Sequence, residues 1–196
     1  KSNISMLSLS EHKLHTPKDV GALYVKKKTP FKPLIIGGHQ ENGLRAGTEN
    51  VASIIGLGKA AELSKKHLEY ENTEVKRLRD KLEAGLTSQI KLTKINGDTI
   101  HRLPNTLNIS FKNVEGESVL LYMNAKNICA SSGSACTTGS LEPSHVLMAM
   151  SVPFEYAHGS IRFSFSRYNT EEDVDYVLSA MPEIIGKLRE MSPFSE

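Results

Sequence analysis

Cysteine is scarce in this sequence, tryptophan is absent and the charges nearly cancel. Two cysteines among 196 residues are too few for the disulfide framework of a small secreted protein, so we expect a reducing, cytoplasmic location. The net charge of +2 is too small to indicate nucleic acid or a membrane surface as a partner. No apolar run has the length of a membrane span. The chain starts at Lys1 without a signal-peptide pattern, so we expect a processed product or a segment of a longer chain.

Several common functional motifs are also missing. The sequence contains neither the phosphate-binding loop Gly-x-x-x-x-Gly-Lys-Ser/Thr nor the nucleophile elbow Gly-x-Ser-x-Gly. Residues 56–61 loosely match the dinucleotide-binding fingerprint, but their flanks read as continuous helix, so we interpret them as a helix-packing stretch of small residues. His12 and His15 have no other His or Cys nearby at ligand spacing, so we expect no metal site.

The remaining sequence has an ordinary globular composition, patterned into strands and helices. Apolar runs and alternation predict strands over 4–10, 20–25, 107–111, 128–130 and 160–165. Apolar residues at three- and four-residue steps and capping signals predict helices over 51–86 with a possible break near residue 70, over 116–124 and 143–150, and after Thr170. This order favours an α/β fold. Residues 1–50 supply strands without covering helices, so we expect them to join a sheet whose other strands lie elsewhere.

The segment from Ser131 to Ser140 loses every large side chain and carries Cys136 among Gly, Ser and Thr. Such a segment buries little apolar surface, and we expect a mobile loop that exposes a thiol. Cys136 is either a reactive group or simply a small residue in a linker. The segment by itself favours neither interpretation.

Two further stretches carry candidate chemistry. Lys13 follows an apolar strand directly after Ser10 and His12, where a lysine held in a pocket could form a Schiff base and its neighbours could bind a phosphate. Arg162 lies on the polar face of the 160–165 strand, where a guanidinium could bind a carboxylate bidentately. Taken singly, each residue is more simply a solvated surface charge.

Together these segments resemble the cysteine desulfurases, which are pyridoxal-phosphate enzymes of fold type I related to class-V aminotransferases, and most closely the nitrogen-fixation type. The resemblance runs nearly end to end, and two blocks are highly specific: Arg45-Ala46-Gly47-Thr48-Glu49-Asn50 and Ser131-Ser132-Gly133-Ser134-Ala135-Cys136. It implies the C-terminal half of such an enzyme. Residues 1–60 would be the end of the large cofactor-binding domain, and residues 61–196 a long bridging helix and a small α/β domain with a short antiparallel sheet and the cysteine loop.

The resemblance also implies how the cofactor, pyridoxal 5′-phosphate, is held. Lys13 matches the Schiff-base lysine, and Ser10 and His12 match phosphate-binding positions. Thr48 matches a threonine that reaches the phosphate of a partner subunit's cofactor, which implies a homodimer. The acid that pairs with the pyridine nitrogen, the ring-stacking histidine and the substrate-binding asparagine of the family lie upstream of the lysine and so outside this sequence.

For substrate and sulfur the resemblance implies two more residues. Arg162 matches the arginine that holds the carboxylate of L-cysteine, and Cys136 matches the nucleophile that takes its sulfur as a persulfide and releases alanine. The implied role is sulfur supply for iron–sulfur cluster assembly through a scaffold or another acceptor protein. Two alternatives stay open: a selenocysteine lyase of the same fold, and a non-catalytic fragment or docking module for sulfur acceptors.

Five residues depart from the family pattern. Glu11 stands where Gly or Ala is usual, and we expect either that its side chain points away from the cofactor phosphate or that the site is altered. Thr16, Asp19 and Ser151 replace usual glycines, and Met148 replaces a usual arginine. Loss of glycine in the turn after Lys13 could shift the lysine.

Overall fold

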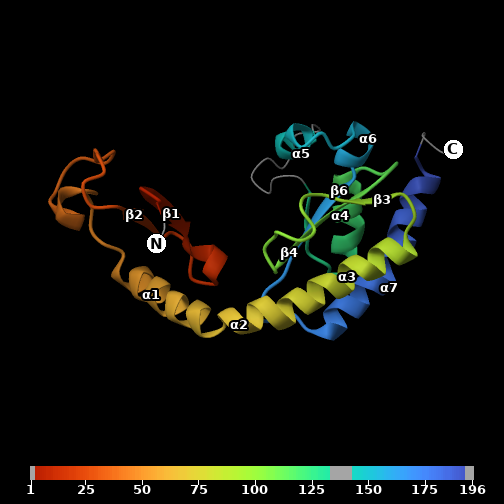
Figure 1. The fold of residues 1–196 in the computed structure, drawn as a ribbon, viewed down its shortest axis with the longest axis horizontal. Coiled ribbons are helices and arrows are strands. Elements are labelled where there is room, and N and C mark those ends of the chain that lie inside the picture. Colours follow the sequence, from red (N-terminus) through yellow and green to blue (C-terminus); the bar gives the residue numbers. More distant parts are fainter. Residues whose placement is uncertain (1–2, 133–142, 193–196) are drawn as a thin grey trace. The chain divides into compact units, whose positions relative to one another are not determined.

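The computed structural model describes residues 3–132 and 143–192 (Figure 1). The chain divides into two compact units, Lys1–Leu68 and Glu69–Glu196, and each is described by itself. Cys136 and the rest of the segment 133–142 lie outside the described residues.

The first unit contains a small antiparallel sheet. Strand β1 (Met6–Ser10) pairs with β2 (Gly21–Val25) from Met6↔Val25 to Ser10↔Gly21. A short 3₁₀ turn, η1 (Glu11–Leu14), follows β1 directly, and a second, η2 (Gln40–Gly43), lies farther along. Both predicted strands are confirmed, the first with a later start. All β1 residues are exposed, including the apolar ones, so this sheet has no covering layer among the described residues.

Helix α1 (Val51–Lys66) completes this unit. The Asn50 side chain caps it by accepting a hydrogen bond from Ser53 N (3.4 Å). The stretch that loosely matches a dinucleotide fingerprint lies inside this continuous helix, as predicted. A Cβ on Gly56 would lie 3.6 Å from the Pro17 ring, so the helix approaches the turn after η1 closely at this small residue.

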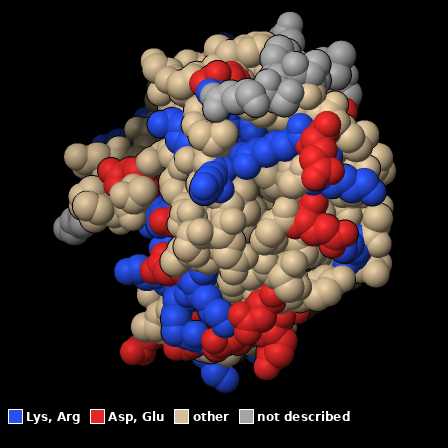
Figure 2. All heavy atoms as spheres, turned by 90° about the vertical axis from the view of Figure 1, so that its right-hand side faces the viewer, with Lys and Arg blue, Asp and Glu red and all other residues tan. Residues whose placement is uncertain are grey.

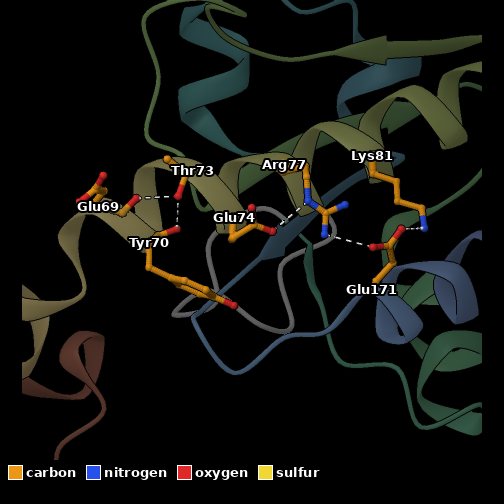
Figure 3. A network of polar contacts seen from close by, with 7 residues as sticks. All are labelled: Glu69, Tyr70, Thr73, Glu74, Arg77, Lys81 and Glu171. Carbon is orange, nitrogen blue, oxygen red and sulfur yellow. Dashed lines mark hydrogen bonds and ion pairs between the residues drawn. The ribbon is translucent and has the colours of Figure 1, made fainter.

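The predicted break near residue 70 is confirmed. Helix α1 ends at Lys66, with His67 as its C-cap, and is followed by α2 (Leu68–Tyr70), the π-helical turn η3 (Glu71–Val75) and α3 (Lys76–Gln89). Thr73 Oγ1 donates hydrogen bonds to the carbonyl oxygens of Glu69 (2.9 Å) and Tyr70 (3.4 Å), as Figure 3 shows. Such bonding to the preceding turn competes with the regular helix ladder and accompanies the change of helix type.

The second unit is built on a four-stranded antiparallel sheet with the order β3-β4-β6-β5. Its strands are β3 (Thr93–Ile95), β4 (Thr106–Phe111), β5 (Ser131–Ser132) and β6 (Ser160–Ser164). Its further helices are α4 (Gly116–Ala125), α5 (His145–Ala149), α6 (Phe154–Ala157) and α7 (Glu171–Glu190).

The predicted strand over 128–130 is wrong: Ile128 is buried without pairing, and the strand begins at Ser131. Strand β3 and helix α6 were not predicted, because three or four residues carry too little periodicity.

One face of this sheet forms the hydrophobic core. Helices α3 and α7 contact each other along this unit, as Figure 1 shows, and α4 contacts α7. Leu82 and Ile184, from α3 and α7, are almost fully buried in the same cluster as the inward-facing residues of β4 and β6. These strand residues are Leu107, Ile109, Phe111, Ile161 and Phe163. The predicted alternation in both strands is confirmed, and the polar residues between them lie on the opposite face.

Charged side chains join α3 to the start of α7. Glu171 accepts hydrogen bonds from Lys81 Nζ (2.7 Å) and Arg77 Nη2 (3.1 Å), and Arg77 Nε also donates to Glu74 (Figure 3). The hydrogen bonds from Lys81 and then Arg77 lower the pKa of Glu171. Thr170 and Asp173 form a capping box at the start of α7, so the backbone amides of both residues are hydrogen-bonded.

Charges of both signs are intermixed on the face shown in Figure 2, in line with the small net charge of the sequence. Among the residues that the structure describes, no helix is both long and apolar enough to cross a membrane.

Candidate functional site

The first group of candidate residues lies where β1 ends. Ser10 is the last residue of β1, and His12 and Lys13 follow within η1. The tight 3₁₀ turn keeps the hydroxyl, the imidazole and the amine within four consecutive residues, and all three residues are exposed. The prediction of a lysine at a strand end is confirmed, whereas its role is not tested by this geometry.

Glu11 is buried within this exposed group. Its Oε1 accepts a hydrogen bond from Asp19 N (3.1 Å) and lies 3.8 Å from His12 Nδ1. Hydrogen bonds from backbone amides, its own first, lower the pKa of Glu11 below the usual value. The carboxylate is therefore directed into the turn that connects η1 with β2, and it ties that turn to the residue preceding His12.

Two residues that replace usual glycines have left-handed backbone conformations. Asp19 has φ 74° and Ser151 has φ 58°, in the region that glycine enters without steric cost. Aspartate tolerates this region better than most residues, and the Glu11 carboxylate accepts from the Asp19 amide there. The third, Thr16, donates a hydrogen bond to the Pro17 carbonyl (3.1 Å). The turn after Lys13 thus forms without glycine.

Replacing Glu11 by Gln is expected to lower the stability of this turn at neutral pH. The folded-state pKa of Glu11 is below its unfolded value of 4.5, so the ionised carboxylate contributes stability above pH 4.5 that is lost as the pH falls through the folded pKa. The unfolding temperatures of wild type and Glu11→Gln should differ at pH 7, and the difference should disappear as the pH is lowered to 3. A difference in unfolding temperature that stays constant with pH would contradict this role.

Thr48 belongs to a loop that is held by hydrogen bonds between side chains and backbone atoms of the loop itself. It follows Gly47, which has φ 108° and donates its amide to Gln40 Oε1 (3.2 Å), and the Arg45 guanidinium donates to the Ala46 carbonyl (2.6 Å). Thr48 takes no part in these hydrogen bonds; it is exposed and lies three residues before the start of α1. A left-handed glycine lets the chain turn sharply before the helix.

Arg162 lies on β6, an inner strand of the sheet in the second unit. It lies on the polar face of β6, opposite Asn108 of β4 on one side and Ser131 of β5 on the other. It is half-buried, and its guanidinium makes no ion pair with any described residue. Ser131, which pairs with Arg162, lies five residues before Cys136 in the sequence.

The structure therefore arranges the candidate residues in two groups. Ser10, His12, Lys13 and Thr48 belong to the first unit, and Arg162 belongs to the second. Cys136 lies outside the described residues, and the other cysteine, Cys129, is a free, exposed thiol.

Sequence reasoning missed the polar neighbours of Arg162. The sequence predicted only that Asn108 and Ser110 alternate with the apolar residues of a half-buried strand, whereas Ser110 is fully buried and both accept hydrogen bonds from Asn96 Nδ2 at 2.7 Å. The alternation placed them on the correct face. Their contacts depend on register with β3, which the sequence did not reveal. Within residues 3–132 and 143–192, no three His, Cys, Asp or Glu side chains form a cluster that could hold a metal ion.

Comparison with known proteins gives a consistent family. The aminotransferase class-V family model matches residues 1–177. A cysteine desulfurase of Gluconacetobacter diazotrophicus is 64% identical over 193 residues, covering 98% of this chain and 48% of that protein. The cysteine desulfurase NifS of Azotobacter vinelandii is 58% identical over the same shares.

Solved structures agree with these relatives. A NifS-like protein superposes with a TM-score of 0.84 at 38% identity, over 95% of this chain and 47% of the other. A NifS-like protein from Rickettsia africae gives a TM-score of 0.84 at 34% identity, over 93% and 48%. The chain spans about half the length of the curated relatives it matches. The fold-type-I α/β expectation is confirmed, and the chain belongs to the class-V aminotransferase family.

Proposed function

We propose that this chain is part of a cysteine desulfurase that converts L-cysteine to L-alanine and collects the sulfur as a persulfide on Cys136. The observation that carries this proposal is the position of Arg162, a guanidinium without an ion pair among the described residues and paired with Ser131 at the start of the cysteine-bearing segment. A carboxylate binder paired with a residue that precedes the thiol by five positions in the sequence suits an amino acid whose sulfur is removed. The named relatives are cysteine desulfurases.

The residues at the end of β1 fit pyridoxal phosphate. Lys13 supplies an exposed amine for a covalent bond, and Ser10 and His12 supply a hydroxyl and an imidazole for the phosphate. When bound, the cofactor supplies an electron sink for chemistry at the substrate α-carbon. In this proposal residues 1–60 are the end of the cofactor-binding domain, and residues 61–196 are the bridging helix and the small domain.

The chain's own residues divide the remaining work. Arg162 binds the substrate carboxylate, and the Lys13 amine removes the α-proton. The Cys136 thiolate attacks the substrate sulfur, so an S–S bond forms as the C–S bond breaks. The substrate carbon gains a proton and leaves as alanine, and the reaction needs no outside oxidant.

A second copy of the chain is part of the proposal. Thr48 is exposed in a stretch whose large apolar residues are exposed too. These include Leu34, Ile36, Val51 and Ile55. Apolar side chains around an exposed threonine suit a homodimer interface at which Thr48 reaches the phosphate in the partner subunit. An iron–sulfur scaffold or other acceptor takes the sulfur from Cys136, in a reducing cytoplasm where Cys129 and Cys136 do not form a disulfide.

Borohydride reduction of the full-length protein tests the cofactor assignment. Reduction makes the bond between the lysine amine and the cofactor permanent, so peptide mass spectrometry should locate one pyridoxal-phosphate adduct, on Lys13. Lys13→Ala should carry no adduct, and Lys18→Ala, an exposed lysine five residues on, should retain it. An adduct elsewhere, or none in wild-type protein, would contradict the proposal and favour a non-catalytic docking module.

A further inference from the structure

Four polar residues form one continuous row across the sheet of the second unit. Asn96 follows β3 and donates its backbone amide to the Asn108 carbonyl (2.9 Å). Asn108 is opposite Arg162, and Arg162 is opposite Ser131. The row therefore begins at the residue after β3 and crosses β4, β6 and β5 on the face away from the hydrophobic core, and it contains no acidic residue.

The pairing brings the side chains of Asn108 and Arg162 close together. Phe111 N donates to the Gly159 carbonyl (2.9 Å), so Phe111 and Gly159 form a hydrogen-bonded pair of the antiparallel ladder. Such pairs alternate with non-hydrogen-bonded ones, and Asn108 and Arg162 lie three positions away. Theirs is therefore a non-hydrogen-bonded pair, the type in which facing side chains approach most closely.

Asn96 fixes the orientation of the Asn108 side chain. Its Nδ2 donates to Asn108 Oδ1 and Ser110 Oγ, both at 2.7 Å. Strands β3 and β6 flank β4 on opposite sides, so an Asn108 amide with its oxygen toward Asn96 presents its NH₂ group toward Arg162. Asn96 Oδ1 is itself buried without a hydrogen-bond partner in the described structure. Burying an unpaired polar atom costs free energy, and a role of Asn96 in positioning Asn108 would explain why this cost is accepted.

We propose that Asn108 is a second donor to the substrate carboxylate beside Arg162, and that Asn96 is the positioning residue that holds it. This inference rests on the proposed function, in which Arg162 binds that carboxylate. A carboxylate has two oxygens with about four acceptor sites, so the Arg162 fork leaves room for an amide donor. An uncharged donor adds affinity without placing a second cation beside Arg162.

Steady-state kinetics of the full-length enzyme with L-cysteine test this assignment. Asn108→Ala should raise KM about tenfold, the loss typical of one hydrogen bond to a charged group, while kcat changes less than about twofold. Asn96→Ala should raise KM less, because Asn108 remains but its amide is no longer held. Thr106→Val alters a residue on the same face of β4, two positions before Asn108, and should leave KM and kcat unchanged.

A variant of nearly identical shape guards against misfolding. Asn108→Asp places a carboxylate beside Arg162, which should pair with the guanidinium and raise KM more than Asn108→Ala does. Arg162→Ala separates the two possible failures. If Arg162→Ala raises KM and neither Asn108 variant does, Asn108 does not bind the carboxylate and the proposed function stands. If Arg162→Ala leaves KM unchanged, the assigned role of Arg162 fails and this inference fails with it.

Discussion

Replacing Cys136 by Ala is expected to abolish sulfur transfer from L-cysteine. The thiolate is the only group in the proposed reaction that can accept the substrate sulfur, and a methyl group offers no nucleophile in its place. Incubation of the full-length variant with L-cysteine should leave no persulfide, detected as the mass of one added sulfur on the protein. Alanine release should fall to the rate without protein, while the Lys13 adduct after borohydride reduction stays.

Cys129 provides a matched control seven residues upstream. It is a free, exposed thiol, so a non-specific reaction of surface cysteines would involve it equally. Cys129→Ala should retain the persulfide and its rate of formation. Turnover of L-selenocysteine by Cys136→Ala at the wild-type rate would instead identify a selenocysteine lyase. Sulfur transfer from L-cysteine that survives Cys136→Ala would overturn the proposed nucleophile.

Replacing Gly159 by Ala should destabilise the second unit by about 3 kcal/mol, the upper part of the usual range for overpacking a core. A Cβ on Gly159 would lie 2.0 Å from the Phe111 carbonyl oxygen and 3.0 Å from that of Val114. Both atoms are backbone and cannot rotate away. The Gly159 carbonyl also accepts a hydrogen bond from the Phe111 amide, so relief of the clash would separate β4 from the residue before β6 at the fully buried Phe111.

Gly186→Ala is the matched control for this effect. Gly186 lies in α7, and a Cβ there would meet no atom within 4 Å. Alanine is favoured over glycine in a helix by about 1 kcal/mol, so this variant should be slightly more stable than wild type. Urea unfolding followed by circular dichroism compares the midpoints. A midpoint for Gly159→Ala at or above that of wild type would show that the strands can separate without cost.

Periodicity predicted the larger elements of this chain, because a long amphipathic stretch carries its pattern in many residues. Helix α3 and the alternating strands β4 and β6 were found with the correct inward faces. Strand β5 was placed three residues early, because Ile128 is apolar and buried while the paired residues are two serines. A two-residue strand has no period, and only pairing with β6 defines it.

For the candidate residues, too, sequence patterns predicted some features, and only the structure revealed others. Lys13 and Arg162 were singled out because each follows or interrupts a clear apolar pattern. The destination of the Glu11 carboxylate was open, since nothing in the sequence states that the Asp19 amide eight residues on would face it. Left-handed Asp19 and Ser151 could be suspected only because glycine is usual there in the resembling family.

The sequence by itself determined the family, the order of the main helices and strands, and the residue types that can bind a carboxylate, form a covalent bond with a cofactor and carry sulfur. Those properties belong to local patterns and to short specific motifs. Only the tertiary structure decided that Asn96, Asn108, Arg162 and Ser131 form one row, because register between strands is set by side-chain packing across the whole sheet. Twelve to fifty-odd positions separate neighbours in that row along the chain, and no local pattern connects residues so far apart.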